Sequence, residues 1–390
     1  MVESANLMED RPDSAENMAA GVPRRTLFVG YRASDIPRNL LSGDATFHAL
    51  DIYDAHAIGK TCGAKTVCSA HLPEGPWDVI RFRTGPKIMS GELALDLMQE
   101  IRARSMESKA LSPSAGRVEL DYVGKERDRN DLIAKIRRDP DRIRDFSSRW
   151  SASVPGGPVL EFTSFPGCFC HRRRDEGGLA LAEIAAREAA GRRGLRLLDM
   201  GCGCGLVGYL VSSVSPGMRI VAVDSHSRAV EAARLNAGNL GIDADVILSD
   251  SGIPPEMDGT FDVFVGNPPY YSDYRIADVF LETAARALKP GGICYTVCKN
   301  EDGLRPVQER YFPEVGIVRR RGYAVLKSVA AATAGKRSEK NRPAAARPAH
   351  IGDRHEKRRG NSGAGGDFHS KKRRFPSKSH RSDIQTVRFA

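Results

Sequence analysis

The chain has 390 residues, of which 41% are hydrophobic and 28% are charged. This length allows two or three domains with buried cores, and no apolar run approaches the roughly 20 residues that a membrane span requires. Residues 1–24 are acidic and polar and lack the pattern of a secretory signal or a transit peptide. We therefore expect a disordered leader, a cytoplasmic protein and no association with a membrane.

The positive charge is concentrated at the C-terminal end. Residues 336–390 contain 16 Lys and Arg but 5 Asp and Glu, a net charge of +11, which leaves −1 for residues 1–335. Large apolar residues are scarce from residue 331 onward, so this segment cannot build a core. The composition predicts a disordered basic tail over 331–390, of the kind that binds polyanions such as RNA.

The eight cysteines lack the CxxC spacing of a zinc knuckle or a redox dithiol. Cys168, Cys170 and His171 offer soft ligands, but no second cluster accompanies them. We therefore predict reduced thiols and no metal site.

The first third of the chain alternates between strand and helix patterns. Short runs rich in β-branched and aromatic residues predict strands at 26–30, 45–50, 77–82 and 117–123. Apolar stripes at helical spacing predict helices at 91–101 and within 125–146. The alternation predicts an α/β domain over residues 25–150.

A turn-rich segment at 151–157 predicts a linker to a second α/β domain over residues 158–330. Near-continuous apolar runs predict its strands at 195–199, 219–224, 244–248, 261–265, 292–297, 315–319 and 323–328. Such runs are typical of a parallel sheet covered by helices on both faces.

The strand at 195–199 leads directly into a loop with three alternating glycines, Gly201, Gly203 and Gly205. Glycine lets the backbone turn tightly and approach a ligand, and the following helix presents its N-terminus to that ligand. Gly203, Gly205 and Gly208 also fit GxGxxG, with Asp224 following Gly205 by 19 residues. A dinucleotide-binding dehydrogenase is therefore one interpretation of the loop, although the motif alone is weak.

A second motif, Asn267-Pro268-Pro269-Tyr270, follows the strand at 261–265 and has no use in a dehydrogenase. It suits methylation of a planar amine or amide nitrogen, whose delocalised lone pair is poorly nucleophilic. The Asn267 side-chain oxygen and the Pro268 carbonyl can accept the two N–H hydrogens and so orient the nitrogen. Consecutive prolines fix the backbone, and Tyr270 would stack on the substrate.

Together, the glycine loop, Asp199 at the end of its strand and the NPPY motif resemble the class I S-adenosylmethionine-dependent methyltransferases, over residues 158–330. The resemblance implies a Rossmann-like, seven-stranded catalytic domain with S-adenosylmethionine as cofactor. It also implies a role for each matching position. Asp199 and the three loop glycines would hold the methionine moiety, Asp224 the ribose hydroxyls and Asp250 the adenine amine.

The flanking segments are similar to those of the RsmC and RlmG family of ribosomal RNA guanine-N2 methyltransferases. Residues 162–181 resemble its PGxFS and DxG segment, and residues 297–300 and 319–327 resemble its last strands. That family also carries an N-terminal domain of degenerate methyltransferase fold, which residues 25–150 would fit, since they have no glycine-rich loop and no NPPY. Two positions depart from the pattern: Tyr270 replaces the usual Phe and Cys170 the usual Ser.

An arginine run in this entry segment, Arg172, Arg173 and Arg174, is a candidate for gripping RNA phosphates near the pocket. A solvated basic turn is an equally good interpretation of the run.

Three functions remain open from the sequence. The leading hypothesis is methylation of guanine N2 in ribosomal RNA, free or within a ribosomal subunit. The first rival is methylation of adenine N6 or of a protein glutamine N5. The second is a non-catalytic RNA-binding or ribosome-assembly factor that retains the fold. The basic tail and the leading domain favour RNA, and the intact motifs favour an enzyme.

Overall fold

The computed structural model describes residues 25–36, 44–138, 143–269, 274–331 and 384–387. The expected leader, Tyr270 and most of the expected tail lie outside these residues. Within the described ranges, no helix is long and apolar enough to cross a membrane. The same ranges hold no group of three or more His, Cys, Asp or Glu placed to bind a metal ion.

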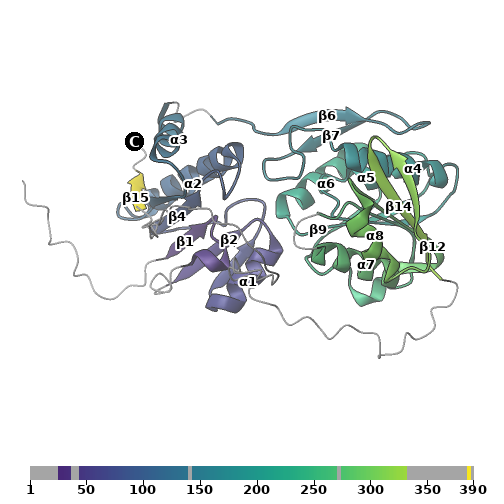
Figure 1. The fold of residues 1–390 in the computed structure, drawn as a ribbon. Helices are drawn as coiled ribbons and strands as arrows, with labels where there is room; N and C mark the ends of the chain where they lie inside the picture. The colour runs from purple at the N-terminus through teal and green to yellow at the C-terminus, as the bar shows by residue number, and fades with distance from the viewer. Residues whose placement is uncertain (1–24, 37–43, 139–142, 270–273, 332–383, 388–390) are drawn as a thin grey trace, which may run out of the picture.

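The first lobe is built on a six-stranded sheet with the order β15-β5-β4-β1-β2-β3. Neighbouring strands are parallel except β15, which pairs antiparallel with β5 (Figure 1). Its strands are β1 (Thr26–Val29), β2 (Ala45–Ala49), β3 (Lys65–Cys68), β4 (Val79–Thr84), β5 (Arg117–Tyr122) and β15 (Ile384–Val387). Its helices are η1 (Ala33–Asp35), α1 (Ile52–Cys62), α2 (Gly91–Leu111) and α3 (Glu126–Arg138).

Alternation along β1 gives this sheet an apolar layer on each face. Leu27 belongs to a core formed with Ile80, Leu97 and other residues of β4, α2 and β5. Phe28, on the opposite face, stacks on Phe47 with ring centroids 4.5 Å apart. Successive side chains of a strand point to opposite faces, so both faces need a helical cover. The expected α/β architecture follows from this requirement.

The second lobe contains a two-stranded hairpin and a seven-stranded sheet with the order β10-β9-β8-β11-β12-β14-β13. Its strands are β6 (Ser148–Ala152), β7 (Leu160–Ser164), β8 (Arg196–Met200), β9 (Arg219–Asp224), β10 (Ala244–Leu248), β11 (Phe261–Gly266), β12 (Leu288–Cys298), β13 (Gly316–Arg320) and β14 (Tyr323–Val329). Its helices are α4 (Glu176–Ala189), α5 (Leu206–Ser212), α6 (Ser227–Leu240), η3 (Pro255–Met257), α7 (Arg275–Ala287) and α8 (Glu301–Glu309).

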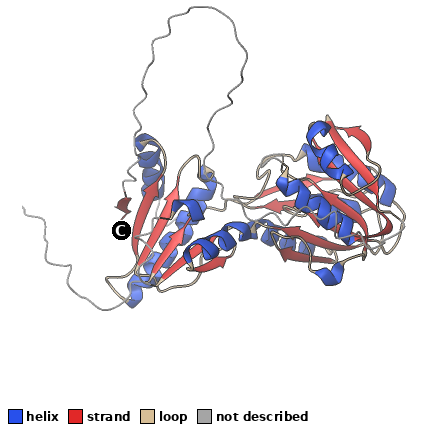
Figure 2. Ribbon diagram, turned by 60° about the horizontal axis from the view of Figure 1, so that its bottom comes forward, coloured by secondary structure: helices blue, strands red, loops and turns tan. Residues whose placement is uncertain are grey.

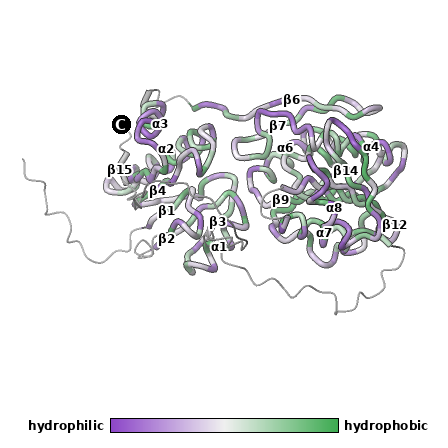
Figure 3. The backbone as a smooth tube through the Cα atoms, in the orientation of Figure 1, coloured by the Kyte–Doolittle hydropathy of each residue, from purple (hydrophilic) through white to green (hydrophobic). Residues whose placement is uncertain are grey.

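Helices cover both faces of the seven-stranded sheet, as the apolar strand runs predict (Figure 2). Residues of α4, α5 and α6 share one core with the sheet, and residues of α7 and α8 share the other. Hydrophobic segments concentrate in the central strands, while α3 lies at the periphery and is hydrophilic (Figure 3). The strand order reverses between β8 and β11, and ligands of open α/β sheets bind at such a point, outside the carboxyl ends of the strands.

The two lobes share one strand order. Strands β3-β2-β1-β4-β5 of the first lobe and β10-β9-β8-β11-β12 of the second are both parallel runs in which the first strand in sequence lies at the centre. The shared order supports the interpretation of residues 25–150 as a second domain of the same kind.

The segment expected as a linker, 151–157, lies in the β6–β7 hairpin instead. Trp150 stacks on Phe162 at 5.3 Å between centroids. Ala152 and Val154 are buried in the core of the second lobe. The Pro and Gly residues that suggested a linker make the hairpin turn, so the second lobe begins by Ser148.

Strand β15 is a further difference from the expectation of a structureless tail. Residues 384–387 read Ile-Gln-Thr-Val, which includes three residues of high strand propensity. They pair with β5, which would otherwise be the edge strand of the first sheet. An edge strand offers unpaired backbone N–H and C=O groups, and β15 satisfies them.

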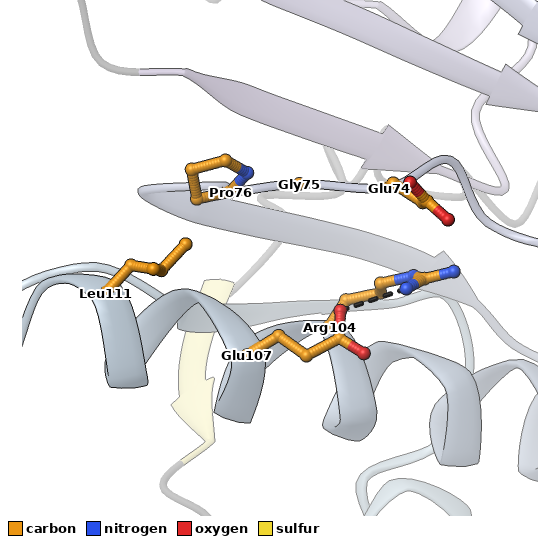
Figure 4. A pocket seen from close by; sticks show the side chains of 6 residues that line it. All are labelled: Glu74, Gly75, Pro76, Arg104, Glu107 and Leu111. Atoms are coloured by element: carbon orange, nitrogen blue, oxygen red, sulfur yellow. Dashed lines mark hydrogen bonds and ion pairs between the residues drawn. The ribbon is translucent and has the colours of Figure 1, made fainter.

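The first lobe also has an open hollow of about 290 Å³ between the loop at Glu74–Pro76 and α2. Figure 4 shows Arg104 beside Glu107 on α2, with Leu111 one turn further along the helix. The hollow contains none of the predicted site residues, so no function is assigned to it.

One buried side chain fastens the hairpin to the helix layer and to the glycine loop. Asn236 of α6 is fully buried. Its Oδ1 accepts from the Thr163 N–H at 2.8 Å, and its Nδ2 donates to the Thr163 and Cys204 carbonyls at 2.9 Å each. All three partners are backbone groups, so the Asn236 amide provides the hydrogen bonds that a neighbouring strand would otherwise provide to them.

Replacing Asn236 with Ala should lower the free energy of unfolding by about 2–4 kcal/mol, because three backbone groups lose their partner. Denaturant titration measures this change. The matched control is Asn239→Ala, on the exposed side of the same helix, which should change stability by less than about 0.5 kcal/mol. Equal effects of the two substitutions would contradict the role given to Asn236.

Candidate active site

The glycine loop after β8 has the backbone that its sequence predicts. Gly201, Gly203 and Gly205 have φ values of 71°, 55° and 88°, in the left-handed region that favours glycine. A Cβ on Gly205 would also lie 2.1 Å from the ring of Tyr209. The loop therefore depends on glycine for its conformation and, at Gly205, for space.

Asp224 joins this loop to the end of β9. Its Oδ2 accepts from the Gly203 N–H at 2.9 Å, and its Oδ1 accepts from the His226 N–H at 2.9 Å. Desolvation raises the pKa of Asp224, while the backbone donors lower it. Desolvation also lowers the pKa of the His226 imidazole to about 4, so that ring is neutral at pH 7. The Asp224 carboxylate thus holds the loop after β8 against the carboxyl end of β9.

Asp199 lies beneath the loop and is only 2% exposed. Its Oδ2 accepts from the Gly208 N–H at 2.8 Å, which ties β8 to α5. A Cβ on Gly208 would lie 2.9 Å from that same oxygen. The third glycine of the GxGxxG match is thus accounted for by close approach to Asp199, a role that the spacing alone does not reveal.

Asn267 follows β11, beside β8 in the sheet. Its Nδ2 lies 3.4 Å from Asp175 Oδ2, so the amide nitrogen is directed at a carboxylate and Oδ1 remains as an acceptor. Pro268 is buried and Pro269 is half-buried. The structure therefore brings Asn267, Pro268 and Pro269 to the sheet edge that carries the glycine loop.

Asp175 is the acid of the DxG segment at 175–177, and the sequence motifs alone give it no role in the site. Its Oδ1 accepts from the Gly178 N–H at 2.9 Å and caps α4, while desolvation raises its pKa. A signal is present in the sequence, since an Asp three residues before a helical glycine fits an N-cap. The contact with Asn267 joins residues 92 positions apart, which no local pattern reports.

Asp250 follows β10 and lies near Asp224. The Ser249 N–H donates to the Asp224 carbonyl at 3.0 Å, so the ends of β9 and β10 lie side by side. The Asp250 Oδ2 is 3.0 Å from Nδ1 of His56, on α1 of the first lobe. Asp250 thus joins the same edge as the glycine loop.

The arginine run is divided in its contacts. The Arg172 Nε donates to Glu92 Oε1 at 2.6 Å, and its Nη2 donates to the Phe146 carbonyl at 3.2 Å. Arg172 is therefore engaged with α2 of the first lobe, while its side chain is still 45% exposed. Arg173 and Arg174 are also exposed, and Arg174 lies 3.8 Å from Glu176.

Comparison with known proteins agrees with this geometry. Residues 159–327 match the model of the methyltransferase small domain. Ribosomal RNA small subunit methyltransferase C of Pseudomonas aeruginosa is 33% identical over 186 residues, which cover 46% of this chain and 53% of that protein. The protein of the same name from Hahella chejuensis is 34% identical over 152 residues, which cover 38% of this chain and 43% of that protein. The chain thus spans about half the length of the curated relatives that it matches.

A solved structure is similar over more of the chain. Thermus thermophilus RsmC, a 16S rRNA N2 methyltransferase in complex with AdoMet and guanosine, has a TM-score of 0.60 and 18% identity, covering 78% of this chain and 88% of that one. This similarity shows the fold, and it extends over more of the chain than residues 159–327, which match the methyltransferase small domain. The expected Rossmann-like α/β fold and the resemblance to RsmC are confirmed.

The buried Asp199 should make the stability of this domain depend on pH. Burial raises its pKa to about 7, above the ordinary value of 3.8. Between these values the folded state holds a proton that the unfolded state loses, so the contribution of Asp199 to stability falls as pH rises from about 4 to 7. Asp199→Asn keeps an oxygen for the Gly208 N–H but cannot ionise.

The free energy of unfolding of the wild type minus that of the Asn variant should therefore fall across this window, by about 1.4 kcal/mol for each pH unit that is crossed. Denaturant titration of both proteins from pH 4 to pH 8 measures the difference. A difference that stays constant or rises with pH would show that folding does not raise the pKa of the Asp199 carboxyl.

Proposed function

We propose that the chain transfers a methyl group from S-adenosylmethionine to N2 of guanine in ribosomal RNA. The observation that carries the proposal is the meeting of the glycine loop, Asp224 and Asn267 at the carboxyl ends of β8, β9 and β11. At this edge of the sheet the glycine loop would bind the cofactor, and the Asn267 amide would orient the amine beside it.

The cofactor supplies an electrophilic sulfonium methyl group. On this side of the site, the glycine loop would hold the methionine moiety, with Asp199 supporting the loop from below. Asp224 would accept from the ribose hydroxyls. Each carboxylate oxygen has two lone pairs, so both can serve a hydroxyl while keeping the backbone N–H bonds described above. Asp250 would accept from the adenine amine.

Asn267 would orient the attacking nitrogen. The guanine amine is planar, and its lone pair is delocalised into the ring, so alignment is what the protein has to provide. With Nδ2 directed at Asp175, Oδ1 of Asn267 can accept one N–H of the amine and the Pro268 carbonyl the other. The nitrogen becomes strongly acidic once it is methylated and can lose its extra proton to water, so no side-chain base is required.

The choice of substrate is supported by the relatives of this domain. The names of these relatives concern ribosomal RNA, and the Thermus structure holds guanosine. The exposed Arg173 and Arg174 and the basic tail would contact RNA phosphates, which position the substrate without specifying the base. A target base in a helix would have to be flipped out, so unpaired or incompletely assembled RNA should react better. An RNA-modifying role also fits a cytoplasmic protein.

Replacing Asp224 with Ala should weaken binding of S-adenosylhomocysteine about tenfold or more. Charge-assisted hydrogen bonds contribute roughly 1.5–3 kcal/mol each, and every 1.4 kcal/mol is a factor of about ten. Calorimetry on the full chain measures the affinity. Asp245→Ala, on the exposed part of β10, is the control and should leave it unchanged. Unchanged affinity in the Asp224 variant would refute the assigned role, and binding of NAD in its place would favour a dehydrogenase.

Replacing Asn267 with Ala should leave cofactor affinity nearly intact but slow methyl transfer by on the order of a hundredfold, because the amide acts on the attacking nitrogen. Single-turnover reactions with labelled cofactor and unmodified ribosomal RNA give the rate, and nucleoside digestion gives the product. We expect N2-methylguanosine. N6-methyladenosine would favour the adenine rival, and near-normal turnover by the variant would contradict the mechanism.

A further inference from the structure

The turn between β2 and α1 of the first lobe contacts the second lobe next to Asp224. Asp51, between β2 and α1, forms an antiparallel β-bridge with His226. The Ile52 N–H donates to the Ser225 carbonyl at 2.9 Å, and the Ser227 N–H donates to the Leu50 carbonyl at 2.6 Å. The residues that follow Asp224 are thus paired, backbone to backbone, with the other lobe.

Side chains reinforce this joint. The Ser225 Oγ donates to Asp51 Oδ2 at 2.8 Å, and the Ser227 Oγ donates to the Leu50 carbonyl at 2.8 Å. Asp51 is also the N-cap of α1, because its Oδ1 accepts from the Tyr53 N–H at 2.8 Å. The N-cap residue of α1 therefore contacts the turn that follows Asp224.

A buried ion pair holds the lobes together nearby. The Arg228 side chain is only 2% exposed, and it pairs with Asp96 and with Glu100, whose Oε1 lies 3.1 Å from Nη2. Breaking such a pair leaves a charge buried without a partner, so the joint is costly to open. The position of α1 relative to the second lobe is accordingly fixed.

One turn into α1, His56 reaches the other acid of the site. Its Nδ1 lies 3.0 Å from Asp250 Oδ2; the side chains are 56% and 19% exposed, respectively. A carboxylate oxygen only accepts, so Nδ1 donates the hydrogen. The same short element, Asp51–His56, thus contacts the loop after Asp224 and the carboxylate of Asp250.

We propose that His56 is a positioning residue of the adenine subsite, and that the first lobe completes the cofactor site of the second. The proposal rests on the proposed function, in that it takes the ligand to be an adenosyl thioether. By donating to Oδ2, His56 fixes the carboxylate of Asp250 and leaves Oδ1 to accept from the 6-amino group of adenine. A domain without a cofactor loop of its own thereby contributes to cofactor binding.

The test is calorimetry of S-adenosylhomocysteine on the full chain. His56→Ala should weaken binding three- to tenfold, and His56→Asn, whose Nδ2 can take the place of Nδ1, should restore most of the affinity. His71→Ala is the matched control. His71 also joins the lobes, through Glu100 at 3.2 Å and Glu231 at 3.0 Å, but contacts neither acid of the site. It should leave the affinity unchanged.

Two further measurements separate positioning of Asp250 from general loosening of the joint. In an Asp250→Ala background, His56→Ala should cause no further loss, because its effect passes through that carboxylate. With S-inosylhomocysteine, which has a carbonyl in place of the 6-amino group, His56→Ala should likewise change little.

Unchanged affinity in His56→Ala would overturn the proposal, as would losses of equal size for both ligands or for His71→Ala. A wild-type chain that binds neither ligand would instead overturn the proposed function on which it rests.

Discussion

The carboxylate of Asp224 is the interaction on which the site depends. One of its oxygens holds the glycine loop through Gly203, and the other holds the turn into α6 through His226. The first contact shapes the loop, and the second fixes the residues that pair with the first lobe. The Asp224 carboxylate, which would bind ribose, thus also connects the ends of β8 and β9. Through His226 it holds the turn that pairs with the first lobe.

In this arrangement, buried strands fix the position of the site, and short loops carry the groups that would contact ligands. The strands β8, β9 and β11 are buried on both faces, so the positions where they end are fixed by packing. The groups that touch ligands stand just beyond these ends, on short loops, where polar atoms remain accessible. Asp175 and Asn236 connect those loops to helices, which limits how far each loop can move. Preorganisation of this kind favours a reaction that needs alignment more than acid–base chemistry.

Features that depend on neighbouring residues in the sequence can be predicted from it, whereas contacts between residues far apart in the sequence cannot. The strands of the second lobe are predictable because their apolar runs are a local property, and the glycine loop because a left-handed backbone demands glycine at given positions. Helix α1 and strand β3 are not predicted. Strand β3 is four residues long with no buried side chain, so it has little apolar pattern to detect. The hairpin turn at 155–157 has the same composition as a linker, which made the linker prediction wrong. Contacts such as His56 with Asp250 join residues 194 positions apart and arise only when the lobes dock.

The central claim is that this chain methylates N2 of a guanine in ribosomal RNA. The most direct measurement is mass-spectrometric mapping of methylated nucleosides in ribosomal RNA from a strain that lacks the gene. The account predicts that one guanine loses its N2-methyl group and regains it when the purified wild-type chain and S-adenosylmethionine are added. Unchanged guanine methylation in the deletion strain, or loss of a methyl group from adenine N6 alone, would contradict it.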